Sequence, residues 1–209
     1  MSNVTYTFSD DMKVGYGHLK DGTRFLFDAD MIDKIKNVKL YRSDTRKEDR
    51  KTYIIDHHGR KLHNYFFAHK KGFEIDHINL NTFDNRRCNV RYCTHQQNQC
   101  NQPLQINNSS GVSGVSYYPP RHKFRARIKI CQHDIHLGYY EKFEEAVMAR
   151  NIGMICMFGE YGRYNKTKAV PRWIIEKVIN ICKRFADLSI CEAFFYYVNG
   201  EKYAENPIG

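Results

Sequence analysis

FEIDHINLNTFDNRRCNVRYCTHQQNQCNQ, residues 73–102, is the most informative stretch of this sequence. Residues 73–77 combine aromatic and β-branched side chains and lead into a loop rich in Asn and Asp, which is typical of a strand entering a turn. Residues 90–94 have the composition of a return strand. Thr94 is a suitable N-cap for a short polar helix over residues 95–101. The stretch therefore predicts strand, loop, strand and helix.

Three side chains in this stretch suit the hydrolysis of a phosphodiester. His77 has an ordinary pKa of about 6.5, so it can take a proton from water near neutral pH. Asp76 leaves the first strand and Asn98 projects from the helix, so a divalent ion fits between these two side chains. Their hard oxygen atoms suit Mg²⁺ or Mn²⁺. One carboxylate and one amide leave most coordination positions to water and phosphate, so we expect weak metal binding without DNA.

The spacing of Asp76, His77, Asn89 and Asn98 resembles that of the HNH nucleases, also called ββα-metal or His-Me finger enzymes. The similar branch is that of phage and intron-encoded homing endonucleases, in which Asn commonly replaces the last His of the motif. The resemblance implies that His77 is the general base and that Asn89 orients this histidine and its loop. It also implies that Asp76 and Asn98 bind the metal.

A second pattern lies in KFRARIKI, residues 123–130, where apolar and basic residues alternate strictly. Such alternation predicts a strand with one buried face. The cationic row on its other face consists of Lys123, Arg125, Arg127 and Lys129. Ile135 and Leu137 continue the alternation in a further strand. From residue 143 the apolar period becomes helical, with Phe143, Ala146, Val147, Arg150, Met154 and Met157 near one stripe.

Residues 111–165 resemble the ethylene-response-factor (apetala-type) DNA-binding domain, which is fused to many phage HNH enzymes. The segments that carry the resemblance are SGVSGVSYY, KFRARIKI, IHLGYYEKFEEAVMARN and FGEYGRYN. The resemblance implies a three-stranded sheet whose free face lies in the DNA major groove. The family's DNA-contact positions fall on Ser113, Ser116, Tyr118, Lys123, Lys129, His136 and Tyr139. Plant members have arginine at the positions of Ser113 and Ser116 and tryptophan at that of His136, so their target sequence is not transferred.

Composition agrees with a nucleic-acid partner. The 209 residues carry a net charge of +10, and the pI is about 9.2. With a nuclease motif, this charge indicates double-stranded DNA rather than a membrane surface. No apolar run is long enough to span a bilayer, and the N-terminus lacks a signal-peptide core. We therefore expect an intracellular, cytoplasmic protein that is not secreted.

Seven cysteines without a paired framework fit a reducing compartment. Cys88, Cys93 and Cys100 lie near the catalytic motif, where some HNH relatives hold zinc. The usual CxxC pairs are absent, and Cys93 falls at an apolar strand position. Structural zinc is therefore not expected.

The remaining segments predict supporting structure. Residues 23–27 form a strand, residues 29–38 a short helix, and residues 53–56 and 61–67 a hairpin. His63 is interpreted as structural or phosphate-touching rather than catalytic. Pro171 suits the first turn of a helix whose apolar stripe contains Ile174, Val178, Ile181, Cys182 and Phe185.

The predicted fold class is α+β. A β-rich segment and a small ββα nuclease core, residues 73–102, make up a domain over residues 1–102. A linker over residues 103–110, a DNA-binding domain over 111–165 and a helical extension over 166–209 follow. The predicted function is that of a metal-dependent homing-type endonuclease that nicks duplex DNA as a monomer. A DNA-binding regulator with an inactive nuclease fold and a dimeric restriction-like HNH nuclease remain alternatives.

Overall fold

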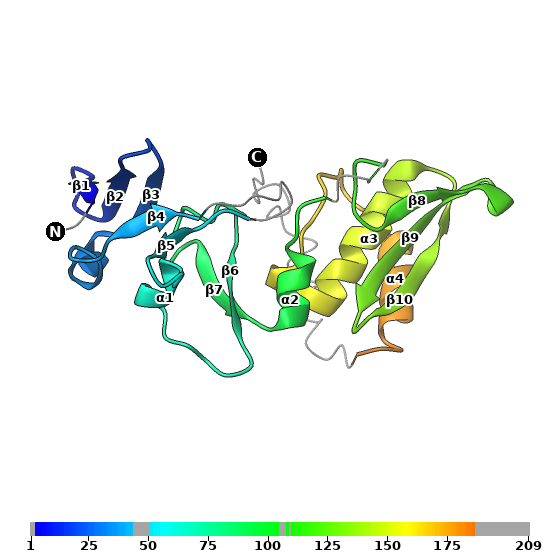
Figure 1. Cartoon of the computed structure of the whole chain (residues 1–209). Coiled ribbons are helices and arrows are strands. Elements are labelled where there is room, and N and C mark those ends of the chain that lie inside the picture. The colour runs from blue at the N-terminus through cyan, green and yellow to red at the C-terminus, as the bar shows by residue number, and fades with distance from the viewer. Residues whose placement is uncertain (1–2, 44–50, 105–107, 109, 187–209) are drawn as a thin grey trace. The chain divides into compact units, whose positions relative to one another are not determined.

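The computed structural model describes residues 3–43, 51–104, 108 and 110–186 (Figure 1). Helices accompany small antiparallel sheets, which confirms the α+β fold class. The chain divides into two compact units, Met1–His95 and Gln96–Gly209, and each unit contains its own apolar core. No helix in the described ranges is long and apolar enough to cross a membrane.

The first unit opens with a three-stranded antiparallel sheet of β1 (Val4–Phe8), β2 (Val14–Leu19) and β3 (Arg24–Asp28), in that order. Phe25 and Phe27 on β3 are fully buried and pack over Gly17 and Gly15, their partners on β2. A Cβ atom at either glycine would overlap the facing aromatic ring. Both glycines are therefore required for the two rings to reach the core.

The structure of the segment after residue 22 agrees with the sequence-based prediction only in part. The predicted strand over residues 23–27 is confirmed, within one residue, as β3. The predicted helix over residues 29–38 is wrong in type and length, because the chain forms the 3-10 helix η1 (Ala29–Lys34). Ile35 and Leu40 are both fully buried in the first core. The chain must turn after η1 to bring both side chains inward, which a longer helix would prevent.

The predicted hairpin over residues 53–56 and 61–67 is confirmed in its first strand and in its turn, where Asp56 N donates to Arg60 O and Leu62 N donates to Ile54 O, but not in its second strand. β5 (Ile54–Asp56) pairs with β4 (Leu40–Arg42), and an isolated bridge joins Ile55 to Lys61. Residues that were expected in the second strand form the short helix α1 (His63–Phe66). Leu62 and Phe66 are buried in the core at a spacing of one helical turn. Burial of these two apolar side chains favours the turn of helix over a strand.

Residues 73–102 adopt the predicted order of strand, loop, strand and helix. β6 (Glu74–His77) pairs antiparallel with β7 (Val90–Cys93), and α2 (His95–Cys100) follows directly. Asp76 lies opposite Arg91, and His77 lies opposite Val90. The first unit ends at His95, so the rest of α2 belongs to the second unit.

The second unit contains the sheet of β8 (Val115–Tyr118), β9 (Lys123–Ile130) and β10 (His133–Tyr140), in which β9 is central. The 3-10 helix η2 (Pro119–Arg121) connects β8 to β9. Ala126, Ile128, Ile135 and Leu137 are buried, which confirms the predicted alternation. The register between β9 and β10 shifts between His136 and Gly138, so Tyr140 also turns into the core.

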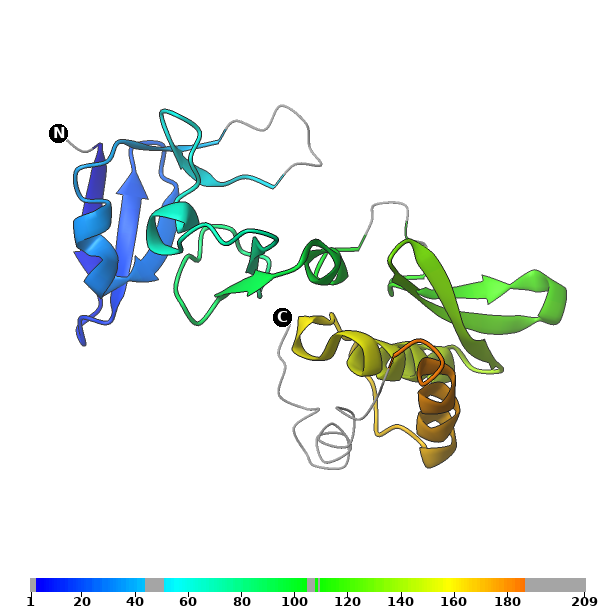
Figure 2. The same ribbon diagram turned by 90° about the horizontal axis from the view of Figure 1, so that it is seen from below.

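Two helices cover the inner face of this sheet (Figure 2). α3 (Phe143–Phe158) ends in the 3-10 helix η3 (Gly159–Tyr161), and α4 (Arg172–Cys182) packs against α3 and β10. Residues 146–155 of α3 are all buried, so the predicted single stripe is part of a wider buried surface. The added burial comes from α4, whose Ile174, Val178 and Cys182 join the same core.

The helical extension departs from the prediction at one residue. Phe185 lies beyond the end of α4, and 54% of the residue is exposed, so it does not extend the apolar stripe. The predicted linker over residues 103–110 lies partly outside the described residues. The part of the predicted extension beyond residue 186 lies wholly outside them.

Candidate functional site

Asp76 and His77 stand side by side at the end of β6, and both are buried. The Asp76 carboxylate accepts two hydrogen bonds at Oδ2, from Arg91 Nε at 3.1 Å and from Arg91 Nη2 at 3.0 Å. Arg91 is the cross-strand partner of Asp76 on β7. The charge of the candidate metal ligand is therefore matched by an arginine that sequence reasoning missed.

His77 lies in surroundings that favour its neutral form. Burial lowers the pKa of His77. Its Nε2 atom lies 3.3 Å from Oδ1 of the buried Asn85. Because an amide oxygen only accepts hydrogen bonds, Nε2 carries the proton and donates it to this contact. Nδ1 is then the basic nitrogen of the ring, which is the state that a general base requires.

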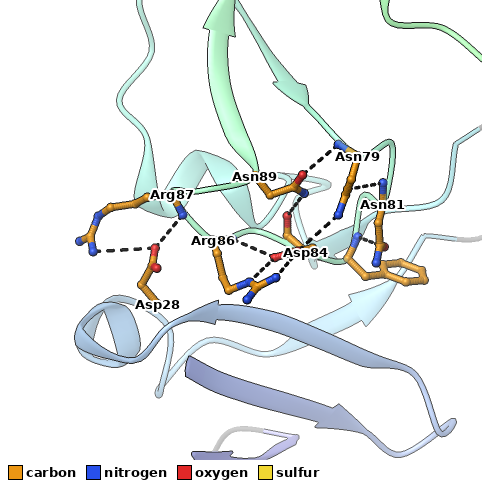
Figure 3. A network of polar contacts seen from close by, with 8 residues as sticks. Asp28, Asn79, Asn81, Asp84, Arg86, Arg87 and Asn89 are labelled. Atoms are coloured by element: carbon orange, nitrogen blue, oxygen red, sulfur yellow. Dashed lines mark hydrogen bonds and ion pairs between the residues drawn. The ribbon is translucent and has the colours of Figure 1, made fainter. Parts of the chain in front are cut away.

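The loop between β6 and β7 is closed by Asn89 (Figure 3). The side-chain oxygen of Asn89 accepts a hydrogen bond from Asn79 N at 2.9 Å, and its Nδ2 donates to Asp84 O at 2.8 Å. In addition, Ile78 N donates to Asn89 O at 2.8 Å. Asn89 thus contacts both sides of the loop that follows His77, and the loop's position sets where Asn85 meets the imidazole.

A polar network holds the same loop in place (Figure 3). Asp84 accepts Arg86 Nε at 2.8 Å on one oxygen and Arg86 Nη2 at 2.7 Å on the other. Arg87 N donates to Asp28 Oδ2 at 2.8 Å, and the Arg87 guanidinium pairs with Asp30. These arginines belong to the DNRR segment that accompanies the nuclease motif in the sequence.

Backbone hydrogen bonds dock the loop on β3. Leu26 N donates to Phe83 O at 2.8 Å, and Asn85 N donates to Leu26 O at 2.9 Å. Both the backbone N–H and the backbone C=O of Leu26 are therefore hydrogen-bonded to the loop. Leu26 also forms a parallel bridge to Asp84. The N-terminal sheet, whose first two strands sequence reasoning missed, fixes the position of Asn85 through these bonds.

Two further aromatic residues surround His77. The His63 ring centroid lies 5.3 Å from that of His77, and the Tyr53 ring centroid lies 6.2 Å from it. Burial, together with the nearby His77 and Lys61, lowers the pKa of His63 to about 3. His63 Nδ1 is buried without a hydrogen-bond partner within the described part of the chain. His63 thus lies at the site as a neutral ring, which fits its interpretation as structural.

Asn98 belongs to the second unit, where α2 carries it. Its backbone oxygen accepts a hydrogen bond from Gln102 Nε2 at 2.9 Å, and its Oδ1 lies 3.4 Å from the same donor. The structure thus brings Asp76, His77 and Asn89 together in the first unit. The Asp76 carboxylate and the Asn98 amide each offer a hard oxygen atom of the kind that Mg²⁺ or Mn²⁺ prefers. Across the described residues, no cluster of three or more His, Cys, Asp or Glu side chains could hold a metal ion.

The second unit presents a separate surface, which we call the open face: the solvent side of the β8–β9–β10 sheet. The register pairs Arg125 with both Ser116 and Tyr139, Arg127 with His136, and Lys123 with Tyr118. Direct cross-strand partners share a face of the sheet. The predicted contact residues that lie on the open face are Ser116, Tyr118, Lys123, Arg125, Arg127, Lys129, His136 and Tyr139. Ser113 is exposed in the turn before β8.

Ion pairs reduce the charge that this face offers. Arg127 Nη1 lies 2.9 Å from Asp134 Oδ2, and Lys123 Nζ lies 2.7 Å from Glu141 Oε1. Sequence reasoning counted both cations but neither acid. An exposed pair of this kind is weak, so a phosphate can still compete for the cation.

Aromatic rings and arginines are interleaved on the open face. Tyr139 lies with its ring centroid 5.2 Å from Tyr118 and 4.4 Å from His136. The Arg121 guanidinium lies 4.5 Å above the Tyr139 ring, and the Arg125 guanidinium lies 5.3 Å above the Tyr118 ring. Arg121 was not among the predicted contact residues, because it lies in η2 rather than in the alternating strand. Aromatic rings and planar cations are suited to contacts with nucleic-acid bases and backbones.

Comparison with family models, with curated proteins and with solved structures finds no match for this chain. Its function therefore has to be inferred from the two groups of residues described above. One is the Asp76 and His77 pair with its braced loop, and the other is the cationic open face of the second unit.

Proposed function

We propose that this chain is a metal-dependent HNH endonuclease of homing type that hydrolyses phosphodiester bonds in double-stranded DNA. The observation that carries the proposal is the position of His77, a buried, neutral imidazole next to Asp76. Its Nε2 atom donates to Asn85, so Nδ1 is the unprotonated nitrogen that would act as the base. Asn89 supports this arrangement by closing the loop that contains Asn85.

The chain's own residues account for the steps that hydrolysis requires. His77 Nδ1 takes the proton from the attacking water, and the ring keeps its orientation because Nε2 remains bonded to Asn85. Asp76 and Asn98 would hold the divalent ion. When bound, Mg²⁺ or Mn²⁺ supplies the positive charge that stabilises the phosphate and the leaving oxygen. We assign structural support of the His77 ring to His63 and Tyr53.

The open face of the second unit is proposed to bind the duplex. Its cations can neutralise phosphates, and a β surface fits the major groove. One active site per chain implies that a monomer nicks one strand. A double-strand break then requires a dimer or two successive cuts.

Plasmid cleavage tests the proposed function directly. A supercoiled plasmid library that carries random sequence, incubated with the full chain and Mg²⁺, should yield open circles. EDTA should abolish the product, because a carboxylate and a neutral amide supply no positive charge to the phosphate, which therefore has to come from the ion. Linear product together with a dimeric mass in solution would instead favour the restriction-like alternative. Cleavage that is indifferent to EDTA would contradict the metal-dependent mechanism.

The second candidate function is a DNA-binding regulator with an inactive nuclease fold. The ion pair between Arg91 and Asp76 favours it, because the carboxylate already has a cation partner. The two functions differ in the plasmid assay. A regulator binds duplex DNA and leaves it uncut at every Mg²⁺ concentration.

Replacing Arg125 and Arg127 together with alanine should weaken DNA binding and flatten its dependence on salt. Each phosphate contact that is lost reduces the slope of log K against log salt by about 0.9. Fluorescence anisotropy with a labelled duplex over a salt series measures both quantities. Asp134→Asn is the matched control: it frees Arg127 from its ion pair and should bind at least as tightly as the native chain. An unchanged slope in the double variant would refute the role of the open face.

A further inference from the structure

Arg91 and Asp76 form an ion pair across the two strands of the candidate nuclease site. They are direct partners in the register of β6 and β7. Only 1% of the Asp76 side chain and 14% of the Arg91 side chain are exposed. The hydrogen bonds from Arg91 Nε and Nη2, at 3.1 Å and 3.0 Å, end on the same carboxylate oxygen of Asp76. The charge of Asp76 is therefore matched by a cation that is part of the chain itself.

Water cannot take the place of this cation. Asp76 is almost fully enclosed, and a carboxylate in such surroundings is strongly destabilised when its partner is removed. A divalent ion bound at Asp76 would compensate the negative charge of the carboxylate, as the Arg91 guanidinium does. The two cations also repel each other at short range. Binding of the ion must therefore weaken the existing pair.

We propose that Arg91 is the internal counter-cation of Asp76 and sets the divalent-ion concentration at which the site fills. The inference rests on the proposed nuclease function, since it takes Asp76 as a metal ligand. In the free chain, part of the ion's binding free energy goes into separating Arg91 from the carboxylate. Arg91 thus acts as a positioning residue that holds the Asp76 carboxylate in place while lowering its affinity for metal.

This role can be tested without an activity assay by measuring how tightly the full-length chain binds Mn²⁺. The loss of the free-ion signal in electron paramagnetic resonance reports the binding. Arg91→Gln should bind Mn²⁺ about tenfold more tightly than the native chain, because a charged hydrogen-bonded partner no longer competes. Arg91→Lys should show a smaller gain, because lysine keeps the charge and loses the planar pair of donors. A residue with a purely structural role would not tighten metal binding when it is replaced.

Arg86→Gln is the matched control. Arg86 forms a comparable two-bond ion pair with the buried Asp84 in the same unit. Its loss should lower stability and leave the dissociation constant for Mn²⁺ unchanged. Tighter Mn²⁺ binding in Arg86→Gln as large as in Arg91→Gln would overturn the inference, because the effect would then not be specific to Asp76.

The remaining outcomes are decisive. Equal or weaker Mn²⁺ binding in folded Arg91→Gln and Arg91→Lys overturns the inference. If Arg91→Gln folds only when Mn²⁺ is added, the ion replaces the missing cation and the inference is supported; if it stays unfolded, Arg91→Lys decides. Failure of the proposed function looks different, because Asp76→Asn would then bind Mn²⁺ as well as the native chain. Binding that depends on Asp76 and is indifferent to Arg91 refutes only the inference.

Discussion

His77→Ala should lower the rate of plasmid nicking by at least about a hundredfold, since a positioned general base contributes about 10²- to 10⁴-fold. The DNA affinity of the chain should be unchanged, because the open face belongs to the other unit. Nicking rates at saturating Mg²⁺ and anisotropy on the same duplex measure the two quantities separately. Equal cutting by the native chain and by His77→Ala would show that another group is the base.

Asn85 provides a graded companion to this experiment. Asn85→Ala should reduce nicking less than His77→Ala, because the imidazole remains and loses only the contact that orients it. Asn85→Asp places a carboxylate beside Nε2, which should raise the pKa of His77 and move the pH–rate profile to higher pH. A profile that stays in place in Asn85→Asp would contradict the contact between these two side chains.

Acid should destabilise the first unit strongly through His63. Burial lowers the pKa of His63 from an ordinary 6.5 to about 3, so the unfolded chain binds a proton at a pH where the folded chain does not. The contribution of the neutral His63 to the free energy of unfolding is fully present above pH 6.5 and is lost as the pH falls toward 3. The slope is at most about 1.4 kcal/mol per pH unit, or about 5 kcal/mol over the whole window.

His63→Leu tests this expectation by urea unfolding at a series of pH values. The variant should lose much of the pH dependence between 6.5 and 3, although His77 titrates in the same direction and will leave a residual slope. At pH 7 its stability should be close to that of the native chain, because Nδ1 of His63 has no partner to lose within the described residues. His57→Gln, at an exposed histidine, is the control. A slope in His63→Leu equal to the native slope would refute the assignment.

Local patterns predicted the elements whose periodicity is strong. The alternation of residues 123–130 gave β9 at its observed bounds, and the onset of a helical period at residue 143 gave the start of α3. The strand, loop, strand and helix order around Asp76 was equally clear. In β9 the buried side chains follow one another at a fixed spacing along the chain.

Elements that depend on distant partners were mispredicted or missed. β2 contains Gly15 and Gly17, which weaken a strand signal, and their role is visible only when Phe27 and Phe25 pack over them. α1 forms because Leu62 and Phe66 reach a core that other segments build. Likewise, α3 is buried beyond its own stripe because α4 returns to cover it.

The amino-acid sequence alone was enough to identify the reactive groups of this protein: an acid next to an imidazole, a following asparagine, and a row of cations on one strand face. These depend on residue type and short-range spacing. The contacts between these groups became visible only in the folded chain. The tertiary structure placed Arg91 on Asp76, Asn85 on His77, and Asp134 on Arg127. Such contacts depend on strand register and loop docking, which set the distance between residues that the chain order leaves apart.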